Sequence, residues 1–355
     1  MIGIMSEIIE IDGSIGEGGG QILRTSFGLA ALLQKPVQIS KIRASRPKPG
    51  LKPQHLTALQ ALSKVCGDIS GNVKLSSSSV AFFPKNIVSS QFIVNIGTAG
   101  SISLLIQQLL PVALKADLKI RICGGTNVDW SPPIEFLQYA LFPILKRMNA
   151  RFEVKLAKRG YYPKGQGAVM FISKKAKLPL KPIVLKDFSE LDHVKIFSHS
   201  ANLPTEVSQN QFISAKKTLQ EKFPEIFFDE QIESKKPSAT IGSGITLIAF
   251  DTKNNMLSAS VLGSKEKPAV VVGMEAAQKL LEELSSKKAV DSHTADQLIP
   301  FMALAKGKSI IYCSKLTRHT LTNISICEQL LPVKFEVKGE LGTTAEISVE
   351  GIAFK

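Results

Sequence analysis

The sequence predicts an α/β protein in which one βαβαββ unit occurs three times and a small α/β insert interrupts the series. Apolar residues at helical spacing alternate with short β-branched runs bounded by Gly, Pro and Ser. The order of elements recurs with a period of roughly 80 residues, which is longer than the periods of solenoid repeats. One segment before the last unit breaks this order. A chain of 355 residues is long enough for such a multi-domain arrangement.

The first two units follow each other directly, and we assign them to residues 1–184. The first unit is predicted to contain strands at 7–12, 37–44, 71–77 and 79–84 and helices at 21–34 and 55–66. The second is predicted to contain strands at 91–97, 118–125, 151–159 and 168–173 and helices at 102–114 and 132–148.

The insert is predicted at 185–272 and the third unit at 273–355. Within the insert we expect strands at 193–200, 245–250 and 257–263, a helix at 207–223 and a solvated polar loop at 230–244. The run that starts at Ala289 supplies a helix, a strand, a second helix and two strands. The third unit therefore lacks an evident first strand.

Charge favours an acidic partner. The 44 Lys and Arg residues against 30 Asp and Glu give a net charge of +14. This charge suits a nucleic acid or a nucleotide, although many of the lysines can simply keep the surface soluble. The N-terminal run lacks the features of a signal peptide, and the most apolar run is too short to span a bilayer. We therefore expect a cytoplasmic protein without a membrane partner.

The four cysteines show no metal or redox spacing. They stand far apart, at Cys66, Cys123, Cys313 and Cys327, with no CxxC pair. This argues against a zinc site or a redox motif. Reduced thiols are expected, and a disulfide stays open for a hyperthermophilic source.

The run KIRASRPKPGLKPQH, Lys41 to His55, combines basic side chains with prolines. Proline removes a backbone donor and collides with the preceding turn, so the run is not a helix interior. It is predicted to be a stiff, extended basic loop that holds an anion.

A short turn precedes the first helix of each repeated unit, and in the first unit it is rich in glycine. GEGGGQ fails the dinucleotide fingerprint because Gln21 stands at the third glycine position. A glycine turn that opens a helix still offers free N–H groups to an anion, and a tight turn without a ligand is an equal alternative. TAGS (98–101) and SHTADQ (292–297) occupy the corresponding places in the other units.

The histidines of the chain differ in the roles that the sequence predicts for them. His193 and His199 lie near a strand of the insert and are interpreted as structural, whereas His55 opens a helix and either contacts phosphate or caps it. His319 follows Arg318 at a predicted helix start. A neutral imidazole at that place can attack phosphorus, or it can serve as a helix cap.

Several of these motifs together resemble the RNA 3′-terminal phosphate cyclase family. The resemblance rests on IDGSIGEGGGQILR, IRASRPKPGLKPQHLTAL, GTAGSISLLIQQLLP, GGTNVDWSPPIEF, ADQL and RHTLTNISICEQLLPVKFEV. It covers nearly the whole chain outside the insert. It implies a large domain of three βαβαββ repeats with a small α/β insert, in agreement with the periodicity.

The resemblance implies an ATP-dependent reaction in three steps. A histidine attacks the α-phosphorus of ATP and releases pyrophosphate, AMP then moves to an RNA 3′-phosphate, and the 2′-hydroxyl closes a 2′,3′-cyclic phosphate while AMP leaves. By position, the nucleophile falls on His319, and Glu17 falls on a carboxylate that helps to hold Mg²⁺ or Mn²⁺. The positions that correspond to ATP and phosphate contacts are Arg24, Arg43, Arg46, Gln54, Gln107, Pro132, Phe136, His293, Asp296 and Gln297.

His293 departs from the family pattern, in which a tyrosine commonly stacks on adenine at this place. A histidine ring stacks with less area, so the preference for ATP is open. Two other functions stay open as well: a non-catalytic cyclase-like RNA-binding factor in ribosomal RNA processing, and an enolpyruvyl-type transferase built from similar repeats. The sequence does not fix the RNA substrate, the metal or whether the protein forms an oligomer.

Overall fold

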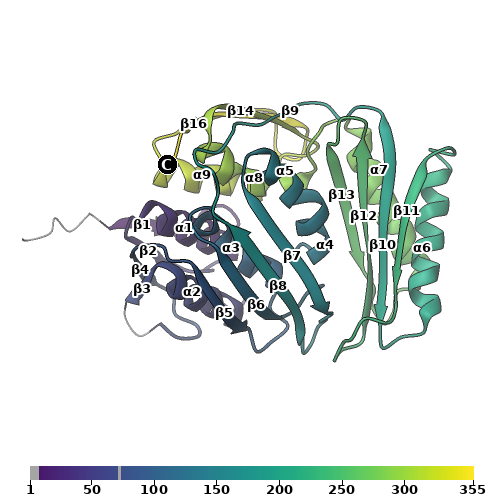
Figure 1. The fold of residues 1–355 in the computed structure, drawn as a ribbon, viewed down its shortest axis with the longest axis horizontal. Coiled ribbons are helices and arrows are strands. Elements are labelled where there is room, and N and C mark those ends of the chain that lie inside the picture. The colour runs from purple at the N-terminus through teal and green to yellow at the C-terminus, as the bar shows by residue number, and fades with distance from the viewer. Residues whose placement is uncertain (1–7, 71–72) are drawn as a thin grey trace, which may run out of the picture.

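The computed structural model describes residues 8–70 and 73–355, and within them the strands form four sheets of four strands each. Figure 1 shows three of these sheets around a set of helices, with the fourth sheet beside them. The α/β class predicted from the sequence is confirmed.

Three sheets have the same connectivity. Their orders are β1-β2-β4-β3, β5-β6-β8-β7 and β9-β14-β16-β15. In each of them the first pair of strands is parallel and the other pairs are antiparallel. The strands are β1 (Ile9–Asp12), β2 (Val37–Ser40), β3 (Gly67–Ser70), β4 (Val80–Pro84), β5 (Ser90–Asn95), β6 (Leu118–Gly124), β7 (Arg151–Lys158), β8 (Gly167–Lys174), β9 (Val184–Leu185), β14 (Lys306–Cys313), β15 (Phe335–Lys338) and β16 (Ala345–Ile352).

Helices from these units pack against one another inside the arrangement of sheets. α1 contacts both α3 and α9, and α8 contacts α9. The helical segments are α1 (Gly20–Leu33), α2 (Pro53–Cys66), α3 (Ile102–Ala113), α4 (Ile134–Phe136), η1 (Leu137–Leu141), α5 (Phe142–Arg147), α8 (Ser292–Leu304) and α9 (Arg318–Leu330). The single helix expected at 132–148 is thus divided by the π-helical η1. Pro143 follows directly, and proline removes an i→i−4 hydrogen bond at this point.

The first strand of the third sheet comes from before the insert. β9 pairs in parallel with β14, where Val184 lies opposite Ile310 and Leu185 opposite Ile311. This strand was not predicted from the sequence, because it contains only two residues and the insert separates it from the other strands of its sheet. The expected division at residue 184 runs through β9.

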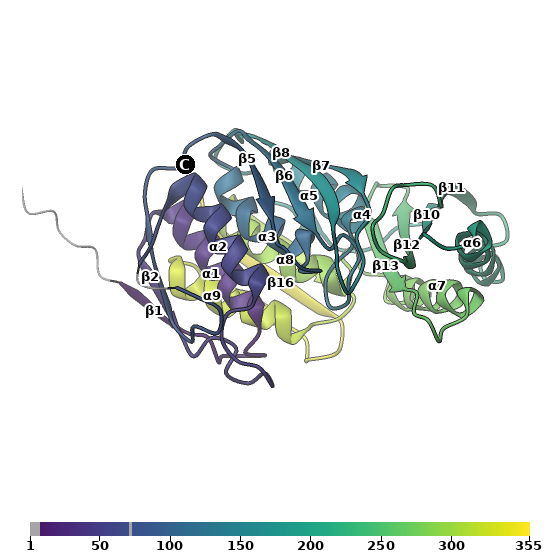
Figure 2. The same cartoon turned by 90° about the horizontal axis from the view of Figure 1, so that it is seen from below.

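The insert forms a small unit at one end of the molecule (Figure 2). This unit has its own hydrophobic core. It consists of β10 (Leu191–Ala201), α6 (Thr205–Gln220), β11 (Phe227–Glu233), β12 (Gly242–Asp251), β13 (Met256–Leu262) and α7 (Ala269–Ser285). α7 packs on α6 and β13, and its Val272, Ala276 and Leu280 are fully buried in this second core. The expected boundary at residue 272 falls inside α7, so we place the end of the small unit after this helix.

Three local expectations were wrong. The polar loop expected at 230–244 begins as β11, an edge strand that pairs only with β10 and so tolerates polar side chains. β2 ends at Ser40 and a series of turns follows it. The strand expected at 71–77 lies at Gly67–Ser70 instead, and Gly71 and Asn72 lie outside the described residues. Glu7, the first residue of the expected strand at 7–12, also lies outside them.

The described residues contain neither a disulfide nor a membrane-crossing helix. All four cysteines are free, and three of them are buried. None of the helices in residues 8–70 and 73–355 combines the length and apolar character that a bilayer span needs.

The large core predicts unequal effects for two adjacent phenylalanines of β4. Phe82 is fully buried and packs edge to face on Phe27, whereas Phe83 is 36% exposed. Phe82→Ala should lower the free energy of unfolding by about 3–5 kcal/mol because it leaves a cavity, and Phe83→Ala by about 1 kcal/mol or less. Urea unfolding followed by circular dichroism measures both. Equal losses would contradict the packing described here.

Candidate active site

His319 lies in the first turn of α9, next to the start of α1. The side chain of Thr317 caps α9 by accepting a hydrogen bond of 3.1 Å from the Thr320 amide. Gln21, in the first turn of α1, donates its Nε2 to the His319 backbone carbonyl at 3.0 Å. The other atom of that amide, Oε1, contacts His319 Nδ1. One side chain of the first unit therefore holds both the backbone and the ring of a residue of the third.

These two contacts determine which ring nitrogen of His319 carries the proton. A backbone carbonyl only accepts hydrogen bonds, so the amide nitrogen of Gln21 must face it and Oε1 must face the ring. Oε1 also only accepts, so His319 Nδ1 carries a proton. In the neutral ring the free electron pair is therefore on Nε2.

Nε2 faces a carboxylate and an arginine. It lies 3.3 Å from Oε2 of Glu17, and the same oxygen lies 3.7 Å from Nη2 of Arg46. The side chains of His319 and Glu17 are 44% and 31% exposed, so a substrate can reach them.

Opposing effects act on the pKa of His319. Burial lowers this pKa, and the cationic surroundings, including Arg24 and Arg46, lower it further, whereas Glu17 raises it. The net direction is down, which favours the neutral ring with its free Nε2.

Helix N-termini from three units converge on this place. A Cβ on Gly20 would lie 2.4 Å from Nε2 of His55, so only glycine lets the start of α1 approach α2 this closely. Gln54, next to His55, accepts a hydrogen bond of 3.1 Å from the amide of Ser101, which caps α3. α1, α2, α3 and α9 thus present their N-terminal ends near one another, an arrangement that attracts anions.

His55 is a cap in this structure. Its Nδ1 accepts a hydrogen bond of 3.1 Å from the Lys52 amide, and the residue is buried. Burial, together with nearby Arg24, Arg43 and Lys52, lowers the pKa of His55 to about 3, so the ring is neutral.

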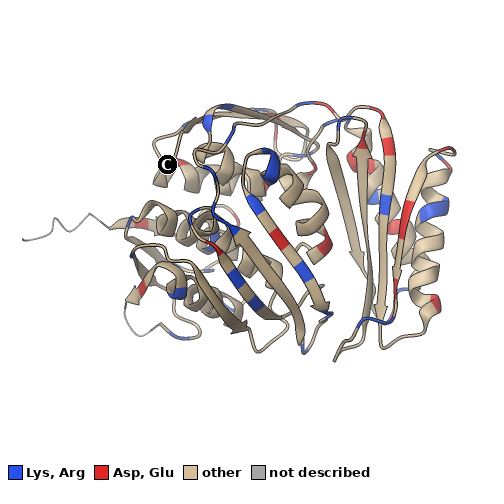
Figure 3. Cartoon of the chain, viewed as in Figure 1, with Lys and Arg blue, Asp and Glu red and all other residues tan. Residues whose placement is uncertain are grey.

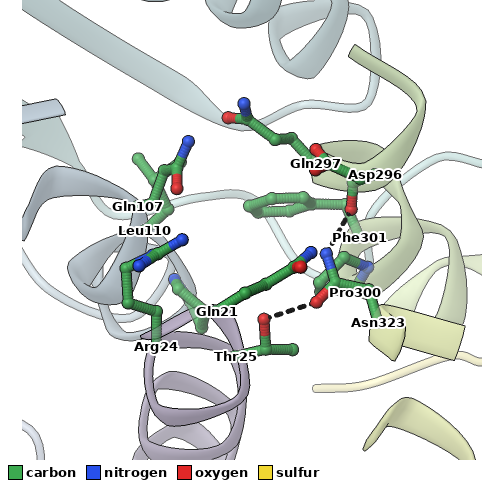
Figure 4. A pocket seen from close by; sticks show the side chains of 11 residues that line it. Gln21, Arg24, Thr25, Gln107, Leu110, Asp296, Gln297, Pro300, Phe301 and Asn323 are labelled. Carbon is green, nitrogen blue, oxygen red and sulfur yellow. Dashed lines mark hydrogen bonds between the residues drawn. The ribbon is translucent and has the colours of Figure 1, made fainter. Parts of the chain in front are cut away.

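A pocket of about 470 Å³, including its open mouth, lies between α1, α3, α8 and α9 (Figure 4). Figure 4 shows Arg24 and Gln107 on one side and Asp296 and Gln297 on the other. The lining residues are Gln21, Arg24, Thr25, Gln107, Leu110, Pro111, Asp296, Gln297, Pro300, Phe301 and Asn323.

Burial perturbs the charged groups of the pocket. It raises the pKa of Asp296 to about 8, although Arg24 opposes this shift, and it lowers the pKa of Arg24 to about 10. Oδ1 of Asp296 and Oε1 of Gln297 are buried and have no hydrogen-bond partner. These two oxygens are therefore acceptors that a bound molecule can satisfy.

The basic loop differs from the extended segment that the sequence predicted. Backbone hydrogen bonds close it into turns, including one of 2.8 Å from the Gly50 amide to the Ile42 carbonyl. Nη1 of Arg43 donates to the carbonyls of Lys48 at 2.7 Å and Gly50 at 3.2 Å, so this guanidinium shapes the loop itself. Lys41 pairs with Asp12 at 2.7 Å.

The structure places the remaining predicted residues at different distances from the centre. His293 is exposed in the first turn of α8 and close enough to lower the pKa of His319. Pro132 accepts a hydrogen bond of 2.6 Å at its carbonyl from Ser103 of α3. Phe136 is buried in the large core and does not line the pocket between the four helices. The functional roles assigned to the predicted site residues stay predictions.

Sequence reasoning missed two residues of this site. Gln21 was considered only as a departure from a glycine fingerprint, although a polar residue on the first turn of an apolar helix is itself a signal. Asn323 accepts from Thr25 Oγ1 at 2.7 Å and donates to the Asp296 carbonyl at 2.6 Å, so it joins α1, α8 and α9. No local pattern distinguishes it.

A histidine with one free ring nitrogen, arginines and converging helix starts beside a pocket with polar lining form the site of an enzyme that handles phosphate groups. The model of the RNA 3′-terminal phosphate cyclase family matches residues 15–337. The chain belongs to this family.

Relatives match over almost their full length. The RNA 3′-terminal phosphate cyclase of Hyperthermus butylicus is 42% identical, covering 98% of this chain and 99% of the relative. Those of Staphylothermus marinus (42%) and Pyrococcus furiosus (41%) cover 98% and 96% of this chain and 99% and 98% of the relatives. The solved enolpyruvyl transferase NikO of Streptomyces tendae aligns over 98% of this chain and 82% of that chain, with a TM-score of 0.23 and 8% identity, which supports no conclusion about fold or function.

The charges around His319 predict opposite shifts for two conservative variants. Glu17→Gln removes the negative charge that raises the pKa of His319, so this pKa should fall further. Arg46→Gln removes a positive charge that lowers it, so the pKa should rise. NMR titration of the His319 ring in the presence of a chelator measures both. Shifts in the same direction for both variants would contradict this electrostatic description.

Proposed function

We propose that this protein converts an RNA 3′-terminal phosphate to a 2′,3′-cyclic phosphate at the expense of ATP. Nε2 of His319 attacks the α-phosphorus, a nitrogen–phosphorus bond forms, and pyrophosphate leaves. An oxygen of the RNA 3′-phosphate then displaces the imidazole and takes AMP. The adjacent 2′-hydroxyl attacks the RNA phosphorus, loses its proton and expels AMP.

The observation that carries the proposal is the pair of contacts that the side chain of Gln21 makes with the backbone carbonyl and the ring of His319. It keeps a proton on Nδ1 and leaves the electron pair of the neutral ring on Nε2, which faces Glu17 and Arg46. A purely structural helix cap does not require a half-exposed ring with one nitrogen left for a substrate. The lowered pKa of His319 increases the neutral, nucleophilic fraction.

Cations around the ring suit the phosphates of both substrates. Arg24 lines the pocket, and Nη2 of Arg46 lies 3.7 Å from Oε2 of Glu17, the oxygen that also lies near Nε2 of His319. A guanidinium offers several donors in a fixed plane and stays charged, which suits phosphate oxygens. The N–H groups of Arg43 that the loop carbonyls do not use are a further set of donors.

Nucleotide binding is supported by the pocket. Gln107, Asp296 and Gln297 line it, and the two unpartnered oxygens described above can accept hydrogen bonds from hydroxyl or amino groups of a nucleotide. His293, at the start of α8, is exposed and free to stack on a base. Pro132 lies at the end of the loop between β6 and α4, and Phe136 is the last residue of α4.

A divalent cation fits this site as a companion of the nucleotide. No group of three or more His, Cys, Asp or Glu side chains with metal-binding geometry occurs within residues 8–70 and 73–355. Mg²⁺, however, commonly binds through one or two carboxylates and the phosphates of a substrate. Glu17 supplies such a carboxylate. Bound Mg²⁺ or Mn²⁺ would neutralise phosphate charge.

The alternative is a cyclase-like RNA-binding factor without catalysis. The net charge of +14 suits RNA under either function. The free electron pair on Nε2 of His319 favours the catalytic function over the non-catalytic one.

His319→Ala should abolish transfer of AMP to the protein, because Nε2 is the attacking atom. Incubation with ATP and Mg²⁺ or Mn²⁺ without RNA, followed by intact-protein mass spectrometry, measures the adduct. His193→Ala, on β10 of the insert, serves as a matched histidine control and should retain the adduct. A modified His319→Ala protein, or an unmodified wild type under both metals, would refute the proposed chemistry.

Glu17→Ala should raise the Mg²⁺ or Mn²⁺ concentration at which adenylation is half-maximal, because the site loses its carboxylate ligand. The rate of AMP adduct formation across a metal titration tests this. An unchanged titration curve would exclude Glu17 as the ligand.

A further inference from the structure

The loop between β6 and α4 exposes the chain's only tryptophan completely. Trp130 has a relative exposure of 100%, the highest among the large hydrophobic side chains that are exposed in the described residues. Its backbone has a φ of 60°, in the left-handed region that bulky residues rarely adopt. A strained backbone that presents an aromatic ring to solvent is typical of a binding element.

Buried polar contacts hold this loop in place. Asn127 is 2% exposed and accepts a hydrogen bond of 3.0 Å from Nη1 of Arg159, which in turn forms an ion pair of 2.8 Å with Glu135. The amides of Thr126 and Asn127 both donate to the carbonyl of Gly160, at 2.9 and 3.3 Å. Trp130 therefore extends from a rigid base, and little ordering is required when it binds.

A second aromatic residue lies on the connection to which this loop is bonded. Tyr162 follows Gly160 in the segment between β7 and β8 and is 75% exposed. Its neighbour Tyr161 is buried and forms a hydrogen bond of 2.8 Å with Nδ1 of His199. Tyr161 thus anchors the segment, while Tyr162 has no comparable structural task.

Lysines accompany the two aromatic residues. Lys164 is exposed on the same connection, Lys158 ends β7, and Lys235 is exposed in the chain that reaches Arg159 through Pro237. Figure 3 shows basic segments at this end of the molecule, both next to β7 and beside the sheet of the insert. Asp129 is the only acidic residue within 126–131 and 159–166.

The Trp130 loop is joined to the candidate active site. Pro132, two residues after Trp130, accepts from Ser103 of α3. Ser101, which caps α3, donates its amide to Gln54 of α2, and His55 lies against Gly20 at the start of α1. The Trp130 loop is therefore connected through α3 and α2 to the start of α1, beside which His319 lies.

We propose that Trp130 and Tyr162 form a stacking platform for the bases of single-stranded RNA that precede its 3′-terminal phosphate. The inference rests on the proposed function and assigns its RNA-binding surface. Base stacking on aromatic rings is tolerant of sequence, and lysines that follow the backbone neutralise its phosphates. This combination suits an enzyme that recognises a strand end.

Because Trp130 is the only tryptophan, its fluorescence reports on this surface in the unmodified protein. The probe is a 3′-phosphorylated oligoribonucleotide of about ten nucleotides, a length within the usual site sizes for single strands. Titration without ATP should quench the emission, and added salt should weaken the binding. ATP alone should leave the emission nearly unchanged. Absence of quenching at RNA concentrations that support binding would overturn the proposal.

Variants separate RNA binding from nucleotide chemistry. Trp130→Ala should raise the RNA concentration for half-maximal binding by about 5- to 100-fold, as expected for the loss of one stacked base. Trp130→Phe should recover most of this affinity, and Tyr162→Ala should weaken binding as well. AMP transfer to the protein in the absence of RNA should stay at the wild-type rate. Phe227→Ala is the matched control, because Phe227 is 68% exposed on the edge strand β11.

Three other results would overturn the platform. Unchanged RNA affinity of Trp130→Ala would show that the ring does not touch RNA. An equal loss of RNA-independent AMP transfer would assign Trp130 to the nucleotide. If light scattering shows that Trp130→Ala changes the molecular mass of the protein in solution, Trp130 lies at a contact between copies of the chain. If the wild-type protein forms no AMP adduct, the proposed reaction is refuted. Quenching of the Trp130 fluorescence by RNA would still support the stacking platform, because this measurement does not depend on AMP transfer.

Discussion

The hydrogen bonds between Gln21 and His319 are the constraint on which the site depends. They join the first turn of α1 to the first turn of α9, residues 298 positions apart in the chain. They require the first and third units to be packed together, and this packing comes from the contacts among α1, α3, α8 and α9. The same contacts enclose the pocket, so one set of helix interfaces orients the imidazole and shapes the space beside it.

Polar side chains near His319 form hydrogen bonds across the interfaces between the helices that surround it. Asn323 links α1 to α8 and Gln54 links α2 to α3. Glycine at position 20 permits the close approach of His55. Glu17, Arg46 and His319 stay partly exposed, whereas Arg24 and Asp296 lie in the pocket, where burial shifts the pKa values of both.

Periodicity and family resemblance predicted most of the helices and strands because these depend on local apolar spacing, but they did not predict α7. The family resemblance also assigned His319, Glu17 and Arg46 to one site, and these three side chains lie close together. Local patterns could not reveal features that arise from distant pairing. β9 is a strand only because β14 lies beside it, α7 belongs to the insert only because its apolar face meets α6 and β13, and the turns at Lys41 and Arg43 use left-handed backbone without glycine.

The position of the insert within the third sheet affects how the protein is made. β9 leaves the ribosome early, but its partner β14 follows only after the entire small unit has been synthesised. α9, with His319, comes later still. Contacts between such distant segments form slowly, since the loop between them must close first. A nascent chain can thus complete its small unit while the residues around His319 are still in two pieces, and the candidate site closes only when synthesis is nearly complete.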